Sequence, residues 1–386
     1  MMGKVQDFSF VLPTRIEFGV GKIKMLPEIV REKGAQRPFI VTDPGIVKAG
    51  ILSIVESLLS EVVSEYKVFE GVEANPKDSN VEEGAKLAKD YGTDLIIALG
   101  GGSSIDCAKA ISILVTLGGR PRDYEGQNHF SVPLVPVIAI PTTAGTGSEV
   151  TFSSVITDSQ EKFKFSIRAE DIAPRVAIAD PELTVSLPPL LTAATGMDAL
   201  THAIEGYTST EAEPIAEACG LYAVGLISKN IRKAVEDGSD LEARSNMLVG
   251  SILAGISFSH SDVASVHCIA EALGGKYDAP HGLCNSVVLP EIMEYNLPFC
   301  LEKYSEIARA MGLSFSSVEE GARMAVLEVK KLAEDVGLPP FSSLGVREED
   351  LEELANNSFR NGSNPSNPRP MDVEDYLTVL KKLMEQ

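Results

Sequence analysis

The stretch LIIALGGGSSIDCAKAISI, residues 95–113, joins an apolar run to three glycines and then to a helical pattern. Its first five residues have the length and the continuous apolarity of a buried strand. Gly100, Gly101 and Gly102 follow, and glycines let a backbone approach an anion closely. The helix that comes next offers unpaired N–H groups and the positive end of its dipole. The stretch therefore predicts a strand, a turn suited to phosphate, and a helix.

A tight turn that binds nothing is an equally good interpretation of these glycines, because they match neither the G-x-G-x-x-G pattern nor the P-loop pattern. A second glycine-rich loop, PTTAGTGSEV at 141–150, changes that balance. It also follows an apolar run, and it offers hydroxyl groups to a polar ligand. The polar side chains of the two loops are Ser103, Ser104, Asp106, Thr142, Thr143, Thr146 and Ser148. Two such loops favour a pyrophosphate site.

Outward from this unit, the first half of the chain alternates short apolar runs with longer helical patterns. The stretches 38–45, 66–69 and 95–99 have the pattern of strands, and 51–60 and 80–91 have the pattern of helices. Such alternation predicts a parallel sheet covered by helices on both faces, with ligands bound at the carboxyl ends of the strands. The first half is therefore expected to be an α/β domain.

The strand patterns stop at the proline-rich stretch PELTVSLPP, residues 181–189. Helical patterns dominate after it, and the segment 356–370 is an irregular link before a last helix. We therefore expect two domains, an α/β domain at 1–187 and a helical domain at 188–386.

Two of the chain's five histidines, His267 and His281, lie close together in the sequence, and a reversal between them is predicted by a Gly-Gly pair that ends one helix and a Pro before the next. Asp198 and His202 are four residues apart and so share one face of a helix. One such pair alone is usually a surface or structural hydrogen bond, but four of these residues together favour a metal site. Donors without a thiolate suit Fe²⁺ or Zn²⁺.

Composition excludes several classes of protein. A net charge of −21 argues against a nucleic-acid surface, which needs clustered Lys and Arg. The five cysteines form no Cys-x-x-Cys pair, so we expect neither a disulfide framework nor a thiolate zinc site, and a reducing compartment is indicated. The N-terminus has no apolar core of signal-peptide length, and no stretch reaches ~18 uninterrupted apolar residues. We expect a cytoplasmic protein with neither a nucleic-acid nor a membrane partner.

Three further residues have both a structural and a functional interpretation. Asp43 lies at the end of an early strand, and its local sequence slightly favours a structural role as the cap of the Asp-Pro-Gly turn. Its functional interpretation is an acceptor for a ribose hydroxyl. In that role its carboxylate would repel a 2′-phosphate and select NAD over NADP. Lys164 would by default be a solvated strand residue. Glu271, four residues after His267, is a surface charge, a proton carrier or an acceptor that orients a ligand.

Over its whole length the chain resembles the iron-containing (group III) alcohol dehydrogenases. The resemblance rests on GGGSSIDCAKA, PTTAGTGSEVT, GMDALTHAIEGY and the stretch from His267 to His281, together with an N-terminal F-x-x-P-x-x-I-x-F-G and a C-terminal Asn-Pro-Arg-Pro. It implies an N-terminal Rossmann-like dinucleotide-binding domain, an all-α C-terminal metal-binding and catalytic domain, and an active site between them. It also implies a homodimer or a higher homo-oligomer.

Position by position, the resemblance assigns roles to individual residues. The implied metal ligands are Asp198, His202, His267 and His281. The implied NAD(H) contacts are Asp43, Gly101, Gly102, Ser103, Thr142 and Thr143, with Asn75 and Lys164 also approaching the dinucleotide. Many members of the family carry a histidine near the nicotinamide where this chain has Glu271, which leaves the route of the proton open.

The expected function is hydride transfer between C4 of a nicotinamide and a small alcohol or aldehyde at the metal, with NAD(H) preferred to NADP(H). A lyase of the dehydroquinate-synthase type would need several Lys and Arg in its cleft, and the glycerol dehydrogenases have fewer histidine ligands. The Asp-x-x-x-His pair disfavours both. A non-catalytic NAD-binding or metal-storage module is a third alternative. The sequence does not identify the alcohol.

Overall fold

The computed structural model of the protein describes residues 7–385 and divides into two compact units. An α/β unit contains residues 12–143 and 148–187. A helical unit contains the described residues from 188 onward, and two earlier segments, 7–11 and 144–147, belong to it as well. The second glycine-rich loop is therefore shared between the two units.

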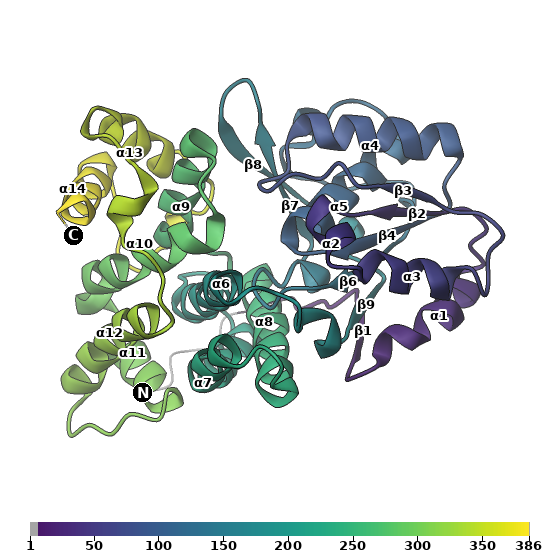
Figure 1. Ribbon diagram of the computed structural model, residues 1–386. Coiled ribbons are helices and arrows are strands. Elements are labelled where there is room, and N and C mark those ends of the chain that lie inside the picture. The colour runs from purple at the N-terminus through teal and green to yellow at the C-terminus, as the bar shows by residue number, and fades with distance from the viewer. Residues whose placement is uncertain (1–6, 386) are drawn as a thin grey trace. The chain divides into compact units, whose positions relative to one another are not determined.

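Six parallel strands form the sheet of the α/β unit (Figure 1). In spatial order they are β1 (Arg15–Phe18), β9 (Val176–Ala179), β6 (Val137–Pro141), β4 (Leu95–Gly100), β2 (Pro38–Val41) and β3 (Lys67–Phe69). Every residue of β2, β4, β6 and β9 is buried, because both faces of the sheet are covered. This is the parallel sheet that the alternating pattern predicts.

Helices cover the two faces of this sheet in two groups. Side chains of α4 (Asp78–Tyr91) and α5 (Gly102–Leu117) pack in one apolar cluster, and those of α1 (Leu26–Lys33) and α3 (Ile51–Leu59) pack in the other. The short helix α2 (Pro44–Lys48) follows β2. A small second sheet contains β5 (Gly126–Gln127), β8 (Phe163–Arg168) and β7 (Ser153–Asp158), of which β7 and β8 are antiparallel.

Nine α-helices make up most of the helical unit, as the second half of the sequence predicts. They are α6 (Pro189–Thr208), α7 (Pro214–Glu236), α8 (Leu241–Ser261), α9 (Ser265–Tyr277), α10 (His281–Asn296), α11 (Leu301–Ala310), α12 (Val318–Asp335), α13 (Leu351–Phe359) and α14 (Val373–Met384). Glycines let α6, α7 and α8 pack closely: a Cβ on Gly206 or Gly220 would lie under 3 Å from Ser257 Oγ. The helices α6 to α14 confirm the predicted α-helical fold of this unit.

Helices α8 and α9 meet at an angle of 101°. The corner between them contains Asp262, whose φ of 62° lies in the left-handed region that non-glycine residues rarely adopt. Asp262 Oδ1 accepts hydrogen bonds from the Val263 N–H at 2.8 Å and from Ser363 Oγ at 2.9 Å, which stabilise this conformation. The corner directs α9, and with it His267, away from the line of α8.

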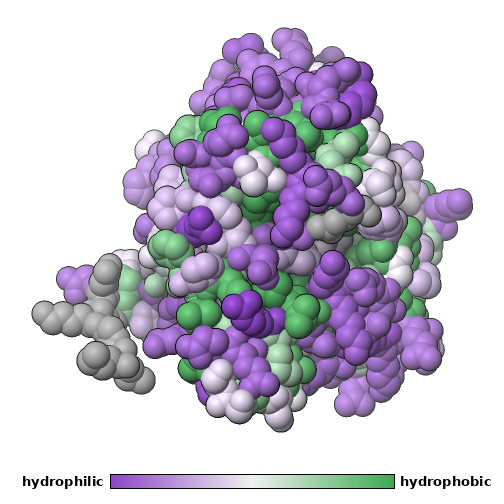
Figure 2. Space-filling model, turned by 90° about the vertical axis from the view of Figure 1, so that its left-hand side faces the viewer, coloured by the Kyte–Doolittle hydropathy of each residue, from purple (hydrophilic) through white to green (hydrophobic). Residues whose placement is uncertain are grey.

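Hydrophilic side chains cover much of the face seen in Figure 2, as a chain with a net charge of −21 leads one to expect. In the described part of the chain, no single helix is both long and apolar enough to cross a membrane. Only α8 and α9 counted together, as a bent pair, meet that test of length and composition.

Candidate metal centre and cofactor site

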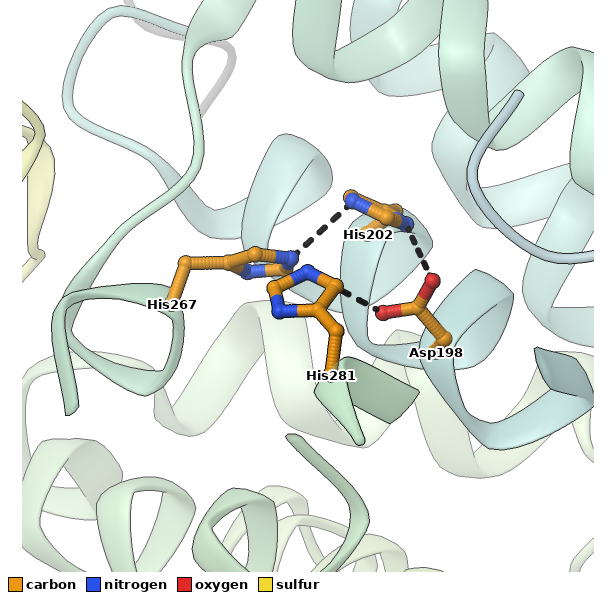
Figure 3. Close-up of side chains that lie close together, drawn as sticks. All are labelled: Asp198, His202, His267 and His281. Carbon is orange, nitrogen blue, oxygen red and sulfur yellow. Dashed lines mark hydrogen bonds and ion pairs between the residues drawn. The ribbon is translucent and has the colours of Figure 1, made fainter. Parts of the chain in front are cut away.

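Four side chains from three helices of the helical unit converge on one point (Figure 3). Helix α6 provides Asp198 and His202, α9 provides His267, and α10 provides His281 as its first residue. Each offers one ligand atom, and these atoms all lie within 4.8 Å of one another. Asp198, His202 and His267 are buried, whereas the side chain of His281 is 25% exposed. The structure therefore brings together all four residues that the sequence analysis singled out as ligands.

The spacing of these donors suits a cation. His267 Nε2 lies 3.0 Å from His202 Nε2, and His281 Nε2 lies 3.6 Å from Asp198 Oδ1. Ligands bound to a metal at about 2.1 Å lie roughly 3 to 3.5 Å from one another. Two unprotonated imidazole nitrogens at such a distance repel each other unless a proton or a cation lies between them. The residues therefore fit a metal with nitrogen and oxygen ligands.

The charge states of the cluster also favour a metal. Burial lowers the pKa of His202 to about 4, so this imidazole is neutral at pH 7 and its lone pair is available. Burial acts to raise the pKa of Asp198, but the imidazoles of His202, His281 and His267 and the amide of Asn285 together hold that pKa below its usual value. The centre thus offers an ionised carboxylate beside the neutral imidazole of His202.

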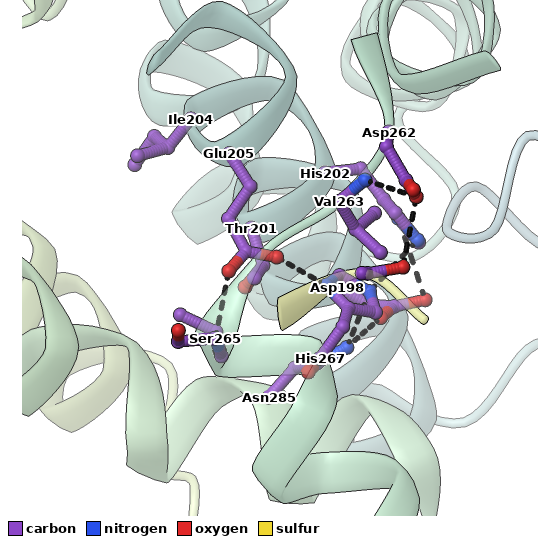
Figure 4. Close-up of polar contacts among 12 residues, drawn as sticks. Asp198, Thr201, His202, Ile204, Glu205, Asp262, Val263, Ser265, His267 and Asn285 are labelled. Atoms are coloured by element: carbon purple, nitrogen blue, oxygen red, sulfur yellow. Dashed lines mark hydrogen bonds and ion pairs between the residues drawn. The ribbon is translucent and has the colours of Figure 1, made fainter. Parts of the chain in front are cut away.

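Glu205 belongs to this centre, and the sequence analysis missed it. It is buried on α6, and its Oε1 accepts a hydrogen bond from the Val266 N–H at 2.8 Å (Figure 4). Its Oε2 lies 2.5 Å from His267 Nδ1, so that His267 Nε2 is left for the ligand cluster. Burial acts to lower the pKa of His267, but the Glu205 carboxylate outweighs it and the pKa is raised. The spacing Asp198, His202, Glu205, which repeats on one helix face, was the available signal.

A close backbone contact brings α10 against α6. A Cβ added to Gly282, directly after His281, would lie 2.4 Å from the carbonyl oxygen of Ala194 on α6. Only a glycine lets the start of α10 approach α6 this closely. The predicted reversal before His281 exists, but the Gly-Gly pair does not end the helix as expected: α9 continues through it to Tyr277, and Asp278 ends it with a φ of 50°.

Glu271 lies one helical turn beyond His267 but is not part of the ligand cluster. Its Oε2 accepts a hydrogen bond from Asn361 Nδ2 at 2.6 Å. Its charge is also among the smaller influences that raise the pKa of His267. The structure thus connects Glu271 to the segment after α13 as well as to a ligand residue.

In the α/β unit, the first glycine-rich turn lies at the carboxyl ends of β4 and β2. Gly100 has a φ of 146°, and a Cβ there would lie 2.6 Å from Ser104 Oγ and 3.1 Å from Asp43 Oδ2. Asp43 Oδ1 caps α2 by accepting from the N–H groups of Gly45 and Ile46, as its structural interpretation predicts. Asp43 Oδ2 accepts from Ser104 Oγ at 3.2 Å. Asp43 therefore lies beside the glycine turn.

The second loop approaches the same glycines within the α/β unit. A Cβ on Gly101 would lie 3.2 Å from Thr143 Oγ1, and Thr142 is buried beside it. Helix α5 begins at Gly102, and Ser103 lies in its first turn. These residues lie where a strand end meets a helix N-terminus, an arrangement that suits an anion. Thr146 lies in the segment 144–147, which belongs to the helical unit.

A buried polar network ties this loop to α5. Ser148 Oγ donates to Asp106 Oδ1, and Lys109 Nζ donates to Ser148 Oγ at 3.0 Å and to Thr151 Oγ1 at 2.9 Å. Burial lowers the pKa of Lys109 to about 8 and raises that of the neighbouring Glu149 to about 7. Asp106 and Ser148, which the sequence analysis proposed as cofactor contacts, thus hold the loop in place.

Lys164 and Asn75 form a buried pair. Lys164 Nζ donates to Asn75 Oδ1 at 2.7 Å, and Asn75 has a φ of 52°. The default interpretation of Lys164 as a solvated strand residue is therefore wrong, because its side chain is buried against this amide. The family resemblance implied that both residues approach the dinucleotide, and that stays a prediction.

Two family profiles match the chain. The profile described as iron-containing alcohol dehydrogenase matches residues 13–181, and the profile for the C-terminal part of the Fe-containing alcohol dehydrogenase family matches residues 192–384. The chain belongs to the iron-containing alcohol dehydrogenase family. It is an oxidoreductase of the metal-dependent alcohol dehydrogenase type, and the resemblance seen in the sequence is confirmed.

Relatives within the iron-containing alcohol dehydrogenases match over almost their full length. The NAD-dependent methanol dehydrogenase of Bacillus methanolicus is 39% identical and covers 97% of this chain and 100% of its own. The 1,3-propanediol dehydrogenase of Klebsiella pneumoniae is 39% identical, and the match covers 97% of this chain and 98% of the relative. A crystal structure of a 1,3-propanediol oxidoreductase aligns with a TM-score of 0.94 at 38% identity, over 98% of this chain and 100% of its own.

Proposed function

We propose that the protein interconverts small alcohols and aldehydes with NAD(H), at a metal held by Asp198, His202, His267 and His281. The convergence of these four ligand atoms within 4.8 Å of one another carries the proposal. A bound divalent cation supplies Lewis acidity, which favours the alkoxide of an alcohol and polarises the carbonyl of an aldehyde, while nicotinamide C4 accepts or donates the hydride. Fe²⁺ is the proposed metal, and the same donors also suit Zn²⁺.

The protein side chains prepare the centre for this chemistry. Asp198 contributes the one negative charge among the four ligands, and burial of His202 keeps its nitrogen unprotonated. The carboxylate of Glu205 fixes the ring of His267 so that Nε2 faces the other donors. With three of the four ligands buried, water is largely kept from the centre.

For the cofactor, we propose that NAD(H) binds at the carboxyl ends of β2 and β4. Backbone N–H groups of Gly101, Gly102 and Ser103 would receive the pyrophosphate, because the turn is free of Cβ atoms and the α5 dipole favours an anion. The carboxylate of Asp43 would accept a hydrogen bond from a ribose hydroxyl and repel a 2′-phosphate. The similarity to an NAD-dependent methanol dehydrogenase supports the same preference.

The proposed substrates are short aliphatic alcohols and the corresponding aldehydes. Two relatives are a methanol dehydrogenase and a 1,3-propanediol dehydrogenase. The ring of Phe258 stacks on the ring of His202, with centroids 4.4 Å apart and an angle of 19° between the planes. A phenyl ring stacked on a proposed ligand keeps water from that face of the imidazole.

For Glu271 we propose an electrostatic and positioning role at His267, because its carboxylate is already hydrogen-bonded to Asn361. Water and the ribose hydroxyls can then carry the proton. Glu271→Gln should therefore weaken metal retention and leave the pH–rate profile unchanged at saturating metal. A flattened profile with full metal occupancy would show that Glu271 relays the proton instead.

The proposed function is tested by removing the metal. Enzyme treated with a chelator should lose NADH-linked aldehyde reduction, and Fe²⁺ should restore it. His267→Ala and His281→Ala should remain folded, hold little metal and stay inactive after the same treatment. Undiminished activity in either variant, with one metal still bound, would refute the four-ligand assignment.

A further inference from the structure

Asn285 lies on α10, one helical turn after His281, and its side chain is completely buried. Its Nδ2 donates to Asp198 Oδ1 at 2.6 Å, and it lies 3.0 Å from His267 Nε2 and 3.2 Å from His281 Nε2. A single side chain thus contacts three of the four proposed ligands. Figure 4 shows it beside Asp198 and His267. The contacts with Asp198 and His267 join α10 to α6 and α9.

The nitrogen of this amide has more hydrogen-bond partners than it can serve, whereas its oxygen lacks one in the part of the chain that the structure describes. An amide nitrogen carries two N–H bonds, so it can serve fully only two of the three acceptors around it. The oxygen of the same amide, Asn285 Oδ1, is buried and accepts no hydrogen bond from residues 7–385. A buried polar atom without a partner is destabilising, and an apolar side chain of the same shape would avoid this loss of stability. Folding alone therefore does not account for an asparagine at this position.

An asparagine at this position is explained by its hydrogen bond to the carboxylate of Asp198. The shortest of the three contacts is the one to Asp198 Oδ1, and that oxygen also lies 3.6 Å from His281 Nε2. Asp198 Oδ2 lies on the side of His202, 3.9 Å from its Nδ1. By holding Oδ1, the amide fixes the rotation of the carboxylate relative to the imidazoles on both sides.

We propose that Asn285 is a positioning residue of the metal centre, which sets the affinity for the cation by orienting Asp198 between His202 and His281. The proposal rests on the ligand assignment of the proposed function. Asn285 does not exchange protons and need not touch the substrate. Its contribution is to keep a carboxylate on α6 aligned with ligands on α9 and α10, so that the cation meets donors that are already in place. Groups of this kind typically change metal affinity by 10- to 100-fold.

The test replaces Asn285 by a leucine, which keeps the branched shape of the side chain and removes the amide. For Asn285→Leu we expect a dissociation constant for Co²⁺ or Zn²⁺ raised about 10- to 100-fold, measured by competition with a chromophoric chelator. The Co²⁺ absorption spectrum should also change, because the ligand geometry is less well fixed. At saturating metal, kcat should recover much of its value. If Asn285→Leu does not fold, Asn285→Ala is used, with the same expectation.

Asn296 provides the matched control on the same helix. It is also buried, and its side-chain amide donates to Asn367 Oδ1 at 3.0 Å and contacts none of the four ligands. Asn296→Leu should lower the thermal stability and leave the metal dissociation constant unchanged. The proposal is overturned if Asn285→Leu binds metal within about twofold of the wild type, or if Asn296→Leu weakens binding equally. Wild-type protein that binds no metal would instead refute the proposed function itself.

Discussion

Glu205 is the buried carboxylate whose charge acts directly on a proposed ligand. Its Oε2 lies 2.5 Å from His267 Nδ1, and this carboxylate raises the pKa of His267 against the effect of burial. Glu205→Gln removes the charge and leaves the shape. The basicity of the imidazole should then fall, and the metal dissociation constant should rise by about 10- to 100-fold in chelator competition.

Glu213 serves as the control for this substitution. It is a buried carboxylate that caps α7 through the N–H groups of Ile215 and Ala216 and does not contact the metal centre. Glu213→Gln should cost some stability but leave metal binding intact. Wild-type metal affinity in Glu205→Gln would mean that the orientation of His267 does not depend on this carboxylate.

Asp43 determines the cofactor preference in our account. Asp43→Asn retains an oxygen that can cap α2, but it removes the charge that would repel a 2′-phosphate. The ratio of kcat/KM for NADPH to that for NADH should increase by roughly tenfold, which corresponds to about 1–2 kcal/mol for a partly solvated charge pair. A wild-type enzyme that already prefers NADPH would contradict the role given to Asp43.

At the scale of helices and strands, the contact between α6 and α10 is the one that brings His281 to Asp198. Gly282→Ala places a Cβ 2.4 Å from the Ala194 carbonyl oxygen, so the start of α10 has to move away from α6. We expect a loss of roughly 1–3 kcal/mol in unfolding free energy, together with weaker metal binding. Gly362→Ala is the control, since a Cβ there meets nothing within 4 Å. If Gly282→Ala behaves like Gly362→Ala, the close approach is not required.

The sequence predicted the α/β alternation from local periodicity. It predicted the four ligands from the Asp198–His202 spacing, the reversal before His281 and the family resemblance. Strands such as β4 are uninterrupted apolar runs, and Asp198 and His202 share a helix face by their spacing alone. Asn285 and Glu205 were not predicted, although each follows a predicted ligand by one helical turn. Their partners lie 87 and 62 residues away in the chain, and helical spacing does not reveal which distant side chains a buried polar group will meet.

At two positions, tertiary packing produces a structure that differs from the one the local sequence predicts. The Gly-Gly pair before Tyr277 is a helix-ending pattern, yet α9 continues through it because both glycines are buried in the helical unit. The local sequence predicted that Lys164 is solvated. Its hydrogen-bond partner, the amide of Asn75, is 89 residues away in the chain, so the sequence around Lys164 gives no sign of it.

At the scale of the whole molecule, the buried network around Lys109 makes the stability of the α/β unit depend on pH. Burial raises the pKa of Glu149 from 4.5 to about 7, so the folded protein keeps this proton up to near neutral pH, whereas the unfolded chain loses it near 4.5. The folded state therefore binds more protons between these values, and its stability falls as pH rises through that window.

Glu149→Gln removes this titration. Relative to the wild type, the variant should gain unfolding free energy steadily from pH 5 to pH 7, by up to about 3 kcal/mol. Denaturant unfolding of both proteins across this range provides the measurement, and the exposed Glu70→Gln serves as the control. A difference that stays constant with pH would show that Glu149 does not hold its proton in the folded state.

In the proposed reaction, hydride passes directly between nicotinamide and substrate, at a centre that works only with its metal. Following deuterium tests both parts at once. Chelator-treated enzyme is loaded with increasing Fe²⁺ and supplied with propanal and NADH deuterated at both C4 positions. We expect propanol with one deuterium at C1, formed at a rate that rises in proportion to bound metal up to one ion per chain. Propanol without deuterium would contradict direct hydride transfer, and a full rate in the metal-stripped enzyme would contradict the need for the metal.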